Sequence, residues 1–161
     1  MYSPALLALA KAVLDEARAK DLRVATAESC TGGLISGLLT EIPGSSDVLE
    51  RGFVVYSNRA KQDLLGVPGE LIADHGAVSE EVACAMAQGA LAHSDAQAAV
   101  AVTGIAGPGG GTKAKPVGLI HVAAYRDETI LHEEHRFGEI GREGVRMKSV
   151  EAALILLRRL F

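Results

Sequence analysis

The chain has 161 residues, of which 48% are hydrophobic, and this content predicts one folded domain over residues 1–161 with a buried core. The formal net charge of −4 argues against nucleic acid or an anionic membrane as the main partner, because both favour a basic face. No apolar stretch reaches the ~20 residues of a membrane span, and residues 4–20 have the pattern of an amphipathic helix rather than a secretory signal. We therefore expect a cytoplasmic protein.

Helices and strands are predicted to alternate along the chain. Apolar periodicity predicts helices over residues 4–20, 33–41, 58–65, 79–93 and 142–160, with one further turn at 71–74. Strands are predicted over residues 22–27, 53–56, 98–103, 116–125 and 129–137, the last two forming a hairpin around 126–128. Asn58 is the predicted cap of the third helix. This order predicts an α/β fold, a three-layer α/β/α domain with a mixed, mostly parallel sheet.

Ser29 lies in the segment AESCTGG (residues 27–33), between the first predicted strand and the second predicted helix. Unpaired N–H groups and the dipole of a helix's first turn favour negative charge there. A serine at this point can attack a carbonyl while nearby amides hold the oxyanion. Taken alone, however, the segment favours an ordinary helix cap. Cys30 is a second candidate nucleophile and ranks below Ser29, since no histidine lies near it in the sequence.

Lys61 and Tyr56 lie in the second candidate segment, VYSNRAK (residues 55–61). A partly desolvated lysine can lose its proton near neutral pH, and serine–lysine pairs use such a base in several hydrolases. Ser57 and Lys61 would share a helical face, and Tyr56 could relay or position a proton. A capping Asn58 with a solvated Lys61 is the simpler alternative. The spacing of five between Tyr56 and Lys61 excludes the short-chain dehydrogenase pair.

A third segment holds five glycines in residues 104–111, directly after a buried strand. Glycine lets a backbone come close to a ligand, although plain linkers also use it. The spacing matches neither a Walker loop nor a dinucleotide fingerprint. We favour a binding loop, because ligands of open α/β sheets bind at the carboxyl ends of strands.

Arg142 and Arg146 share one face at the start of the last helix and could clamp a phosphate. A solvated helix face is the alternative. The histidines and the two cysteines, Cys30 and Cys84, show no spacing typical of a metal site or a disulfide framework. We therefore expect no metal.

Six ordered motifs together give the chain a family resemblance. They are TAESCTGG (26–33), VYSN (55–58) with Lys61, LLGV (64–67), GAVS (76–79), the loop 104–111 and KPVG (115–118). On these motifs the chain resembles the CinA C-terminal domain family over nearly its whole length. Stand-alone members of that family are nicotinamide-nucleotide amidases.

The resemblance implies hydrolysis of the amide of nicotinamide mononucleotide to nicotinic acid mononucleotide and ammonia. It implies a site without metal or cofactor, a mixed sheet flanked by helices, and self-association into a homo-oligomer. By motif position, Ser29 is the expected nucleophile, Lys61 its base and Tyr56 a positioning or proton-relay group. The expected substrate-binding residues are Cys30, Thr31, Gly32, Gly33, Thr103, Gly104, Gly107, Gly109, Gly110 and Arg142.

Two positions depart from the family pattern. The family more often has an acidic or small residue at Arg59, and an acidic or amide residue at Gly141, which puts the role of Arg142 in question. A non-catalytic nucleotide-binding or competence-linked interaction module is the alternative function. The co-occurrence of Ser29, Tyr56 and Lys61 favours the enzyme, since phosphate binding alone does not need them.

Overall fold

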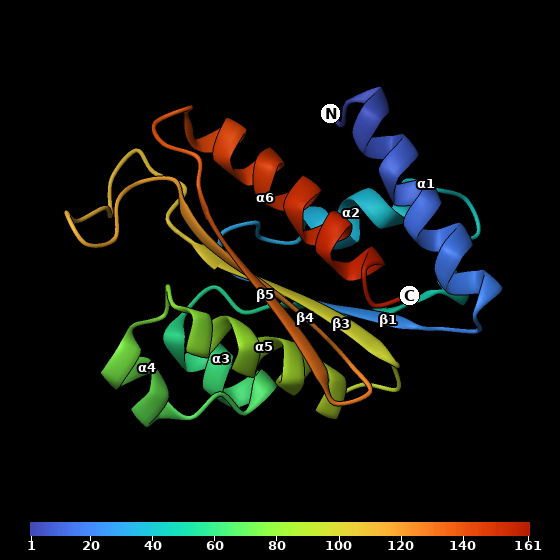
Figure 1. Ribbon diagram of the computed structural model, residues 1–161, viewed down its shortest axis with the longest axis horizontal. Helices are drawn as coiled ribbons and strands as arrows, with labels where there is room; N and C mark the ends of the chain where they lie inside the picture. Colours follow the sequence, from blue (N-terminus) through green and yellow to red (C-terminus); the bar gives the residue numbers. More distant parts are fainter.

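Five strands form one mixed sheet in the order β2-β1-β3-β4-β5 in the computed structural model, which describes residues 1–161 (Figure 1). The strands are β1 (Val24–Glu28), β2 (Leu49–Val54), β3 (Ala98–Gly104), β4 (Leu119–Arg126) and β5 (Thr129–Arg136). β1 is parallel to both β2 and β3, whereas β4 is antiparallel to both β3 and β5. All strands except β4 therefore point the same way, which confirms the predicted mixed, mostly parallel sheet.

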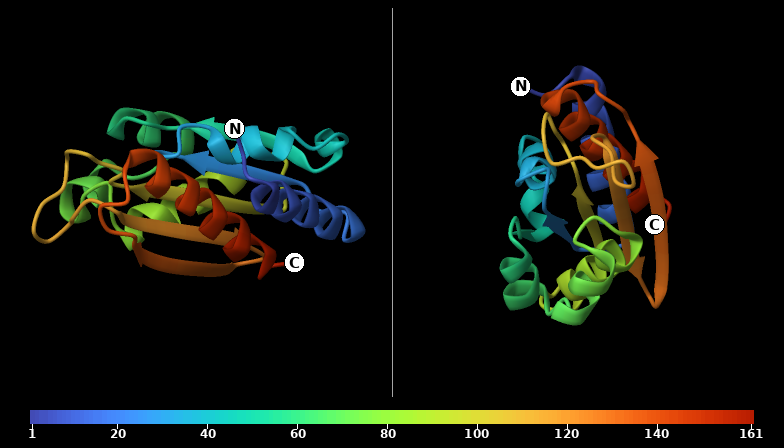
Figure 2. Two further views of the ribbon diagram at one scale, coloured as in Figure 1. Left: turned by 90° about the horizontal axis from the view of Figure 1, so that it is seen from above. Right: turned by 90° about the vertical axis from the view of Figure 1, so that its left-hand side faces the viewer.

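Helices cover both faces of this sheet. The helices α1 (Pro4–Ala19), α2 (Leu34–Thr40) and α6 (Arg142–Arg158) pack on one face, and α3 (Asn58–Leu65), α4 (Gly69–His75) and α5 (Glu80–Ala92) on the other. A short 3₁₀ helix, η1 (Ser45–Asp47), precedes β2. The two helical layers stand apart on either side of the strands in Figures 1 and 2. The predicted three-layer α/β/α architecture is confirmed.

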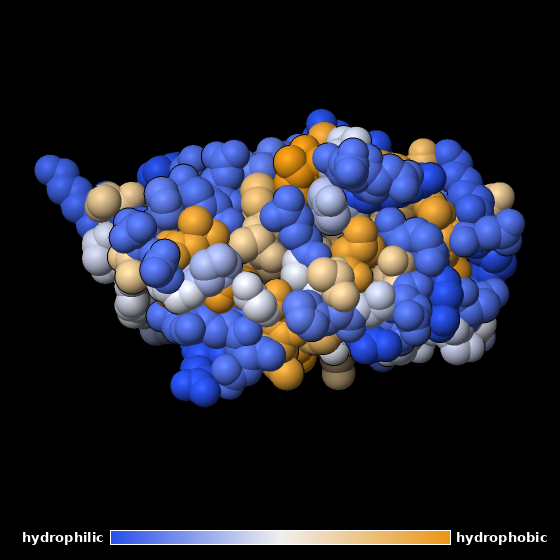
Figure 3. Space-filling view, turned by 90° about the horizontal axis from the view of Figure 1, so that it is seen from below, coloured by the Kyte–Doolittle hydropathy of each residue, from blue (hydrophilic) through white to orange (hydrophobic).

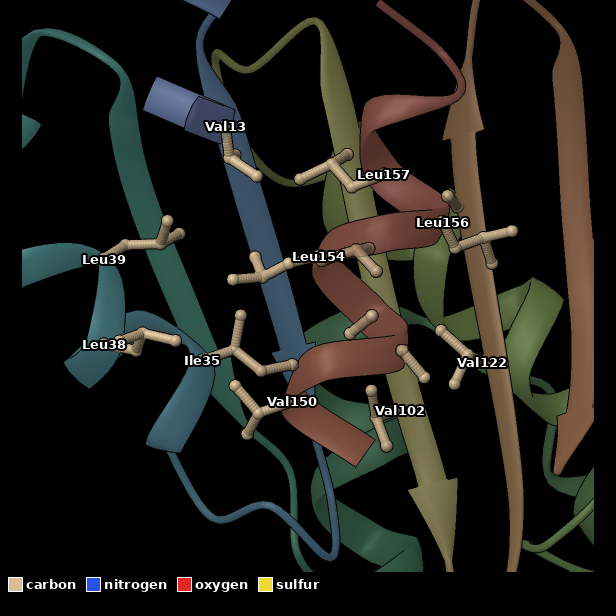
Figure 4. Close-up of a cluster of buried hydrophobic side chains, with 14 of the residues drawn as sticks. Val13, Ile35, Leu38, Leu39, Val102, Val122, Val150, Leu154, Leu156 and Leu157 are labelled. Carbon is tan, nitrogen blue, oxygen red and sulfur yellow. The ribbon is translucent and has the colours of Figure 1, made fainter. Parts of the chain in front are cut away.

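The two faces of the sheet carry different side chains, because successive residues of a strand point to opposite faces. Branched residues fill the space under α1, α2 and α6, among them Ile35, Val102 and Leu154 (Figure 4). The face under α3 and α5 is lined mainly by strand alanines, which let α5 approach the sheet closely: Ala25, Ala27, Ala99, Ala101 and Ala123. The odd-numbered residues of β1 therefore face α3 and α5.

Several predicted boundaries are wrong. β2 begins at Leu49 rather than 53, because the charged residues Glu50 and Arg51 and the following Gly52 hide the strand pattern at this sheet edge. β4 begins at Leu119 rather than 116, since Gly118 has a left-handed φ of 90° that strand residues do not adopt. The predicted turn at 71–74 is part of a seven-residue helix, α4.

The cap of α3 is Ser57 and not Asn58: the Ser57 hydroxyl accepts the Ala60 N–H at 3.0 Å. None of the helices combines the length and the apolar character that crossing a bilayer demands. Seen from the side of α3, α4 and α5, the surface is mostly hydrophilic, with small separate apolar patches (Figure 3).

Candidate functional site

The candidate site lies where the three parallel strands end. Glu28, the last residue of β1, pairs with Val54 of β2 on one side and Val102 of β3 on the other. Ser29 follows directly and its N–H donates to the Val102 carbonyl at 3.0 Å. Segments far apart in the sequence thus meet around Ser29 at the carboxyl edge of the sheet, where open α/β sheets bind ligands.

Lys61 reaches this point from α3 and contacts the hydroxyl of Ser29. Its Nζ lies 3.1 Å from Ser29 Oγ and donates to the Val55 carbonyl at 3.0 Å. The Lys61 side chain is 1% exposed. This burial lowers the pKa of Lys61 below its usual value, and no carboxylate contributes to offset it. A lysine with a lowered pKa can take the proton of Ser29 at a pH where a solvated lysine stays charged.

Cys30 is buried beside Ser29, and its burial raises the pKa of the thiol to about 12. The thiolate is the nucleophilic form of cysteine, so Cys30 stays a neutral thiol near neutral pH. Of the two adjacent candidates, only Ser29 contacts a base.

Glu28, and not Ser29, caps α2. The fully buried Glu28 carboxylate accepts the N–H groups of Ile35 at 2.8 Å and Ser36 at 3.1 Å. The capping interpretation of Ser29 is therefore wrong. The expectation that the first turn of α2 offers free N–H groups to an oxyanion is also wrong at these two positions, because a carboxylate already occupies them.

Two other amides next to Ser29 remain free. The N–H groups of Cys30 and Thr31 donate to no backbone carbonyl of the chain. The Gly32 N–H closes the turn by donating to the Ser29 carbonyl at 3.0 Å. Cys30 lines the cavity beside Ser29 whereas Thr31 is fully buried, so the amide of Cys30 is the candidate for holding negative charge beside Ser29.

Glu28→Gln is expected to lower the free energy of unfolding by about 2 kcal/mol, because hydrogen bonds to a charged, buried group are lost. An amide at this position keeps one acceptor but turns an NH₂ group toward a helix N–H. Chemical denaturation of the variant measures the loss. Glu41→Gln, an exposed position after the same helix, serves as control and should stay within about 0.5 kcal/mol of the wild type. An equally stable Glu28→Gln protein would contradict the capping role.

A cavity of about 210 Å³ opens beside Ser29 and Lys61. It brings together seven of the residues expected from the sequence: Ser29, Cys30, Tyr56, Lys61, Thr103, Gly104 and Arg142. It also contains four that sequence reasoning did not single out: Asn58, Ala77, Val78 and Ala106. All four lie within the motifs VYSN and GAVS or in the loop 104–111, so membership of a motif was the available signal. The Thr103 hydroxyl donates to the Ala77 carbonyl at 2.9 Å and ties two walls together.

The remaining expected residues lie outside this cavity. Thr31 is fully buried and its hydroxyl has no partner, while Gly32 and Gly33 form the turn after it with left-handed φ values of 58° and 98°. Gly109 and Gly110 line a separate cavity of about 590 Å³, together with Arg136 and Glu139 among others. The glycine-rich loop therefore borders two cavities, and it projects beyond the sheet in Figure 1.

Arg142 and Arg146 make different contacts, although both start from one face of α6. Arg142 donates to the Gly107 carbonyl at 2.8 Å and to the Tyr56 hydroxyl at 3.3 Å. Arg146 donates to the carbonyls of Cys30 and Thr31, each at 3.1 Å. The two side chains therefore do not form a joint clamp.

Arg142 places a positive charge at the mouth of the cavity, although the whole chain is acidic. Its guanidinium contacts a carbonyl and a hydroxyl rather than a carboxylate. An unpaired cation at the mouth of a cavity favours anionic ligands. Tyr56, which is 63% exposed, stands at the same mouth.

Comparison with known proteins identifies relatives that match most of the chain. A family model described as the CinA C-terminal domain matches residues 6–161. A CinA-like protein from Syntrophobacter fumaroxidans is 50% identical over 151 residues, which are 94% of this chain and 35% of that protein. A putative competence-damage inducible protein from Caldicellulosiruptor bescii is also 50% identical, over 87% of this chain and 34% of its own. The chain thus spans about a third of the length of these curated relatives.

Solved structures show the same fold. The competence/damage inducible protein from Agrobacterium tumefaciens has a TM-score of 0.97 and 51% identity, covering 99% of this chain and 98% of its own. A CinA superfamily protein from Escherichia coli has a TM-score of 0.93 and 31% identity, covering 100% of this chain and 94% of its own.

Proposed function

The chain belongs to the CinA C-terminal domain family, and from this and the site geometry we propose that it hydrolyses the carboxamide of nicotinamide mononucleotide. The products are nicotinic acid mononucleotide and ammonia. One observation carries the proposal: a buried lysine with a lowered pKa lies 3.1 Å from the hydroxyl of Ser29. Phosphate binding alone has no use for that pair, whereas acyl transfer needs an activated nucleophile.

The proposed reaction proceeds through an acyl-enzyme. Ser29 Oγ attacks the carboxamide carbon while neutral Lys61 takes the hydroxyl proton. The oxyanion of the tetrahedral intermediate is held by the N–H group of Cys30, and such a donor contributes roughly 3 kcal/mol. The C–N bond then breaks, and ammonia leaves with a proton from Lys61. Water, activated by Lys61, hydrolyses the nicotinoyl ester and regenerates Ser29.

Cavity size and charge support a nucleotide as substrate. Pockets that enclose drug-sized ligands usually hold about 300–1,000 Å³, so the 210 Å³ beside Ser29 suits the pyridine carboxamide and leaves the phosphate end outside. Arg142 at the cavity mouth and the free amides of the glycine-rich loop are the groups nearest to such an anion. The pyridinium withdraws electrons from the carboxamide and makes its carbon more electrophilic.

Ammonia release from nicotinamide mononucleotide by the purified protein tests the proposal. We expect one equivalent of ammonia for each nicotinic acid mononucleotide formed. Binding of the nucleotide without any ammonia release would contradict the enzyme and favour a nucleotide-binding module, the alternative function.

Nicotinamide riboside, which lacks the phosphate, is expected to be hydrolysed far less efficiently than the nucleotide, with a lower kcat and a higher KM. Binding energy from a remote group helps to orient the reacting centre, so a truncated substrate loses rate as well as affinity. Steady-state kinetics on both compounds give the ratio. Equal efficiency would show that the protein does not recognise the phosphate.

Gly109→Val then tests whether the glycine-rich loop takes part in that recognition. A Cβ at Gly109 meets no atom within 4 Å and its φ is not left-handed, so the variant should fold normally. Gly110 is a poorer probe, because its φ of 87° strains any side chain. A fall in kcat/KM for the nucleotide but not for the riboside would assign phosphate binding to the loop. Gly109→Ala, with a smaller side chain, is the control and should have a smaller effect.

A further inference from the structure

Arg146 links helix α6 to the turn that carries Ser29. Its Nε donates to the Cys30 carbonyl and its Nη2 to the Thr31 carbonyl, both at 3.1 Å. More than a hundred residues of chain separate these partners, and the side chain is half-buried between them. Neither the core nor the proposed chemistry explains why a guanidinium should hold two consecutive carbonyls.

The geometry of the peptide bond gives these contacts a consequence. In a trans peptide the C=O and the following N–H point in opposite directions. The Thr31 carbonyl accepts from Arg146 and also from the Leu34 N–H at 3.1 Å, so the Thr31–Gly32 peptide turns its N–H away from α6, and the Gly32 N–H donates to the Ser29 carbonyl at 3.0 Å. By the same argument, the Ser29–Cys30 peptide, whose carbonyl accepts this bond, turns its N–H the other way; that N–H belongs to Cys30, which lines the cavity, and it has no backbone acceptor.

We propose that Arg146 is a positioning residue: it fixes the peptide planes of residues 30–32 and thereby orients the N–H of Cys30, a residue that lines the cavity, toward the oxyanion formed at Ser29. The inference rests on the proposed function, because an oxyanion arises only in acyl transfer. Arg146 need not touch the substrate: Arg142, and not Arg146, lines the cavity. Its planar fork suits the task, since two donors in a fixed geometry restrain two carbonyls at once.

Arg146→Met tests the inference, because methionine keeps an unbranched side chain but has no donor. We expect kcat to fall roughly 10- to 100-fold, less than the ~100- to 1,000-fold cost of removing an oxyanion donor because here the donor stays and only its placement is lost, while KM stays within about threefold because ground-state binding is untouched. The matched control is Arg159→Met at the far end of α6, where the arginine pairs with Glu133 on the surface. It should keep the wild-type kcat.

Rescue separates positioning from a general loss of structure. In Arg146→Ala, added ethylguanidinium should restore kcat, whereas ethylammonium of the same charge should not, since only the guanidinium presents two coplanar donors. Rescue by both cations would mean that Arg146 supplies charge alone. A raised KM with unchanged kcat would mean that it binds substrate. Either result overturns the inference.

A substrate-independent measurement separates this inference from the proposed function. A fluorophosphonate reacts with an activated serine: Lys61 takes the hydroxyl proton, the Ser29 Oγ–P bond forms as the P–F bond breaks and fluoride leaves, and the P=O oxygen occupies the place of the oxyanion. Labelling of Ser29 should be slower in Arg146→Met than in wild type and in Arg159→Met. Absence of ammonia release by the wild type would reject the nicotinamide nucleotide substrate alone. Equal labelling rates would overturn the role of Arg146, whatever the substrate.

Discussion

Ser29→Ala should abolish turnover of nicotinamide mononucleotide, with a loss of roughly four orders of magnitude or more, as for other hydrolases deprived of a member of their catalytic group. The Ser29 hydroxyl is the only nucleophile in contact with Lys61. The fold should be retained, because alanine already occupies positions 25 and 27 on the same face of β1 and Lys61 keeps its bond to the Val55 carbonyl. Ammonia release and calorimetric binding of the nucleotide measure the two effects.

Ser36→Ala is the matched control for this variant. Ser36 also carries a hydrogen-bonded hydroxyl, 2.6 Å from that of Thr26, but on the other side of the sheet. We expect it to keep the wild-type kcat. A Ser29→Ala protein with the wild-type rate would remove Ser29 from the mechanism.

Lys61→Arg should lower kcat by about a hundredfold or more, the usual contribution of a general base, because a guanidinium does not deprotonate in proteins. The pH profile gives a sharper test. Burial lowers the pKa of Lys61, so kcat/KM of the wild type should rise with pH and level off below the ordinary lysine pKa of about 10.4. Lys61→Arg should lack this rising limb, and an unchanged profile would contradict the pairing of Ser29 with Lys61.

The same burial of Lys61 lowers the free energy of unfolding at pH values where a solvated lysine is charged. Between its lowered pKa in the folded state and its ordinary pKa in the unfolded chain, the unfolded chain binds more protons, so wild-type stability rises with pH. Lys61→Met removes this dependence. It should melt at a higher temperature than the wild type near neutral pH, and the difference should shrink toward ~pH 10. A lower melting temperature of Lys61→Met at all pH values would contradict this.

The layers of the fold were predictable from local patterns, since apolar periodicity and turn residues report burial directly. β2 shows where this fails. It is an edge strand, so the charged residues Glu50 and Arg51 fit the structure well but give no apolar alternation. Gly118 shows the same limit at β4, because its left-handed φ depends on the surrounding chain and not on the residues beside it.

Those residues of the site that lie in recognisable sequence motifs were predictable. Ser29, Tyr56 and Lys61 follow β1 and β2, and the parallel pairing of these strands brings them to one edge. The contacts of Glu28 and Arg146 were not predictable, because each depends on how a helix lies against the turn. A carboxylate that accepts hydrogen bonds from two amides produces no recognisable residue spacing in the sequence. The same holds for a guanidinium that donates to carbonyls 115 and 116 residues away.

The alternation at the end of β1 has a consequence for how the chain can evolve. Glu28 points toward α2 and Ser29 toward Lys61, because neighbouring residues of a strand face opposite sides. Deleting one residue of β1 would exchange these sides. A carboxylate would then meet the buried lysine and pair with it, while the hydroxyl would turn toward the unpaired start of α2. Insertions and deletions should therefore be found in the loops of this family and not between residues 24 and 29, even where substitutions are tolerated.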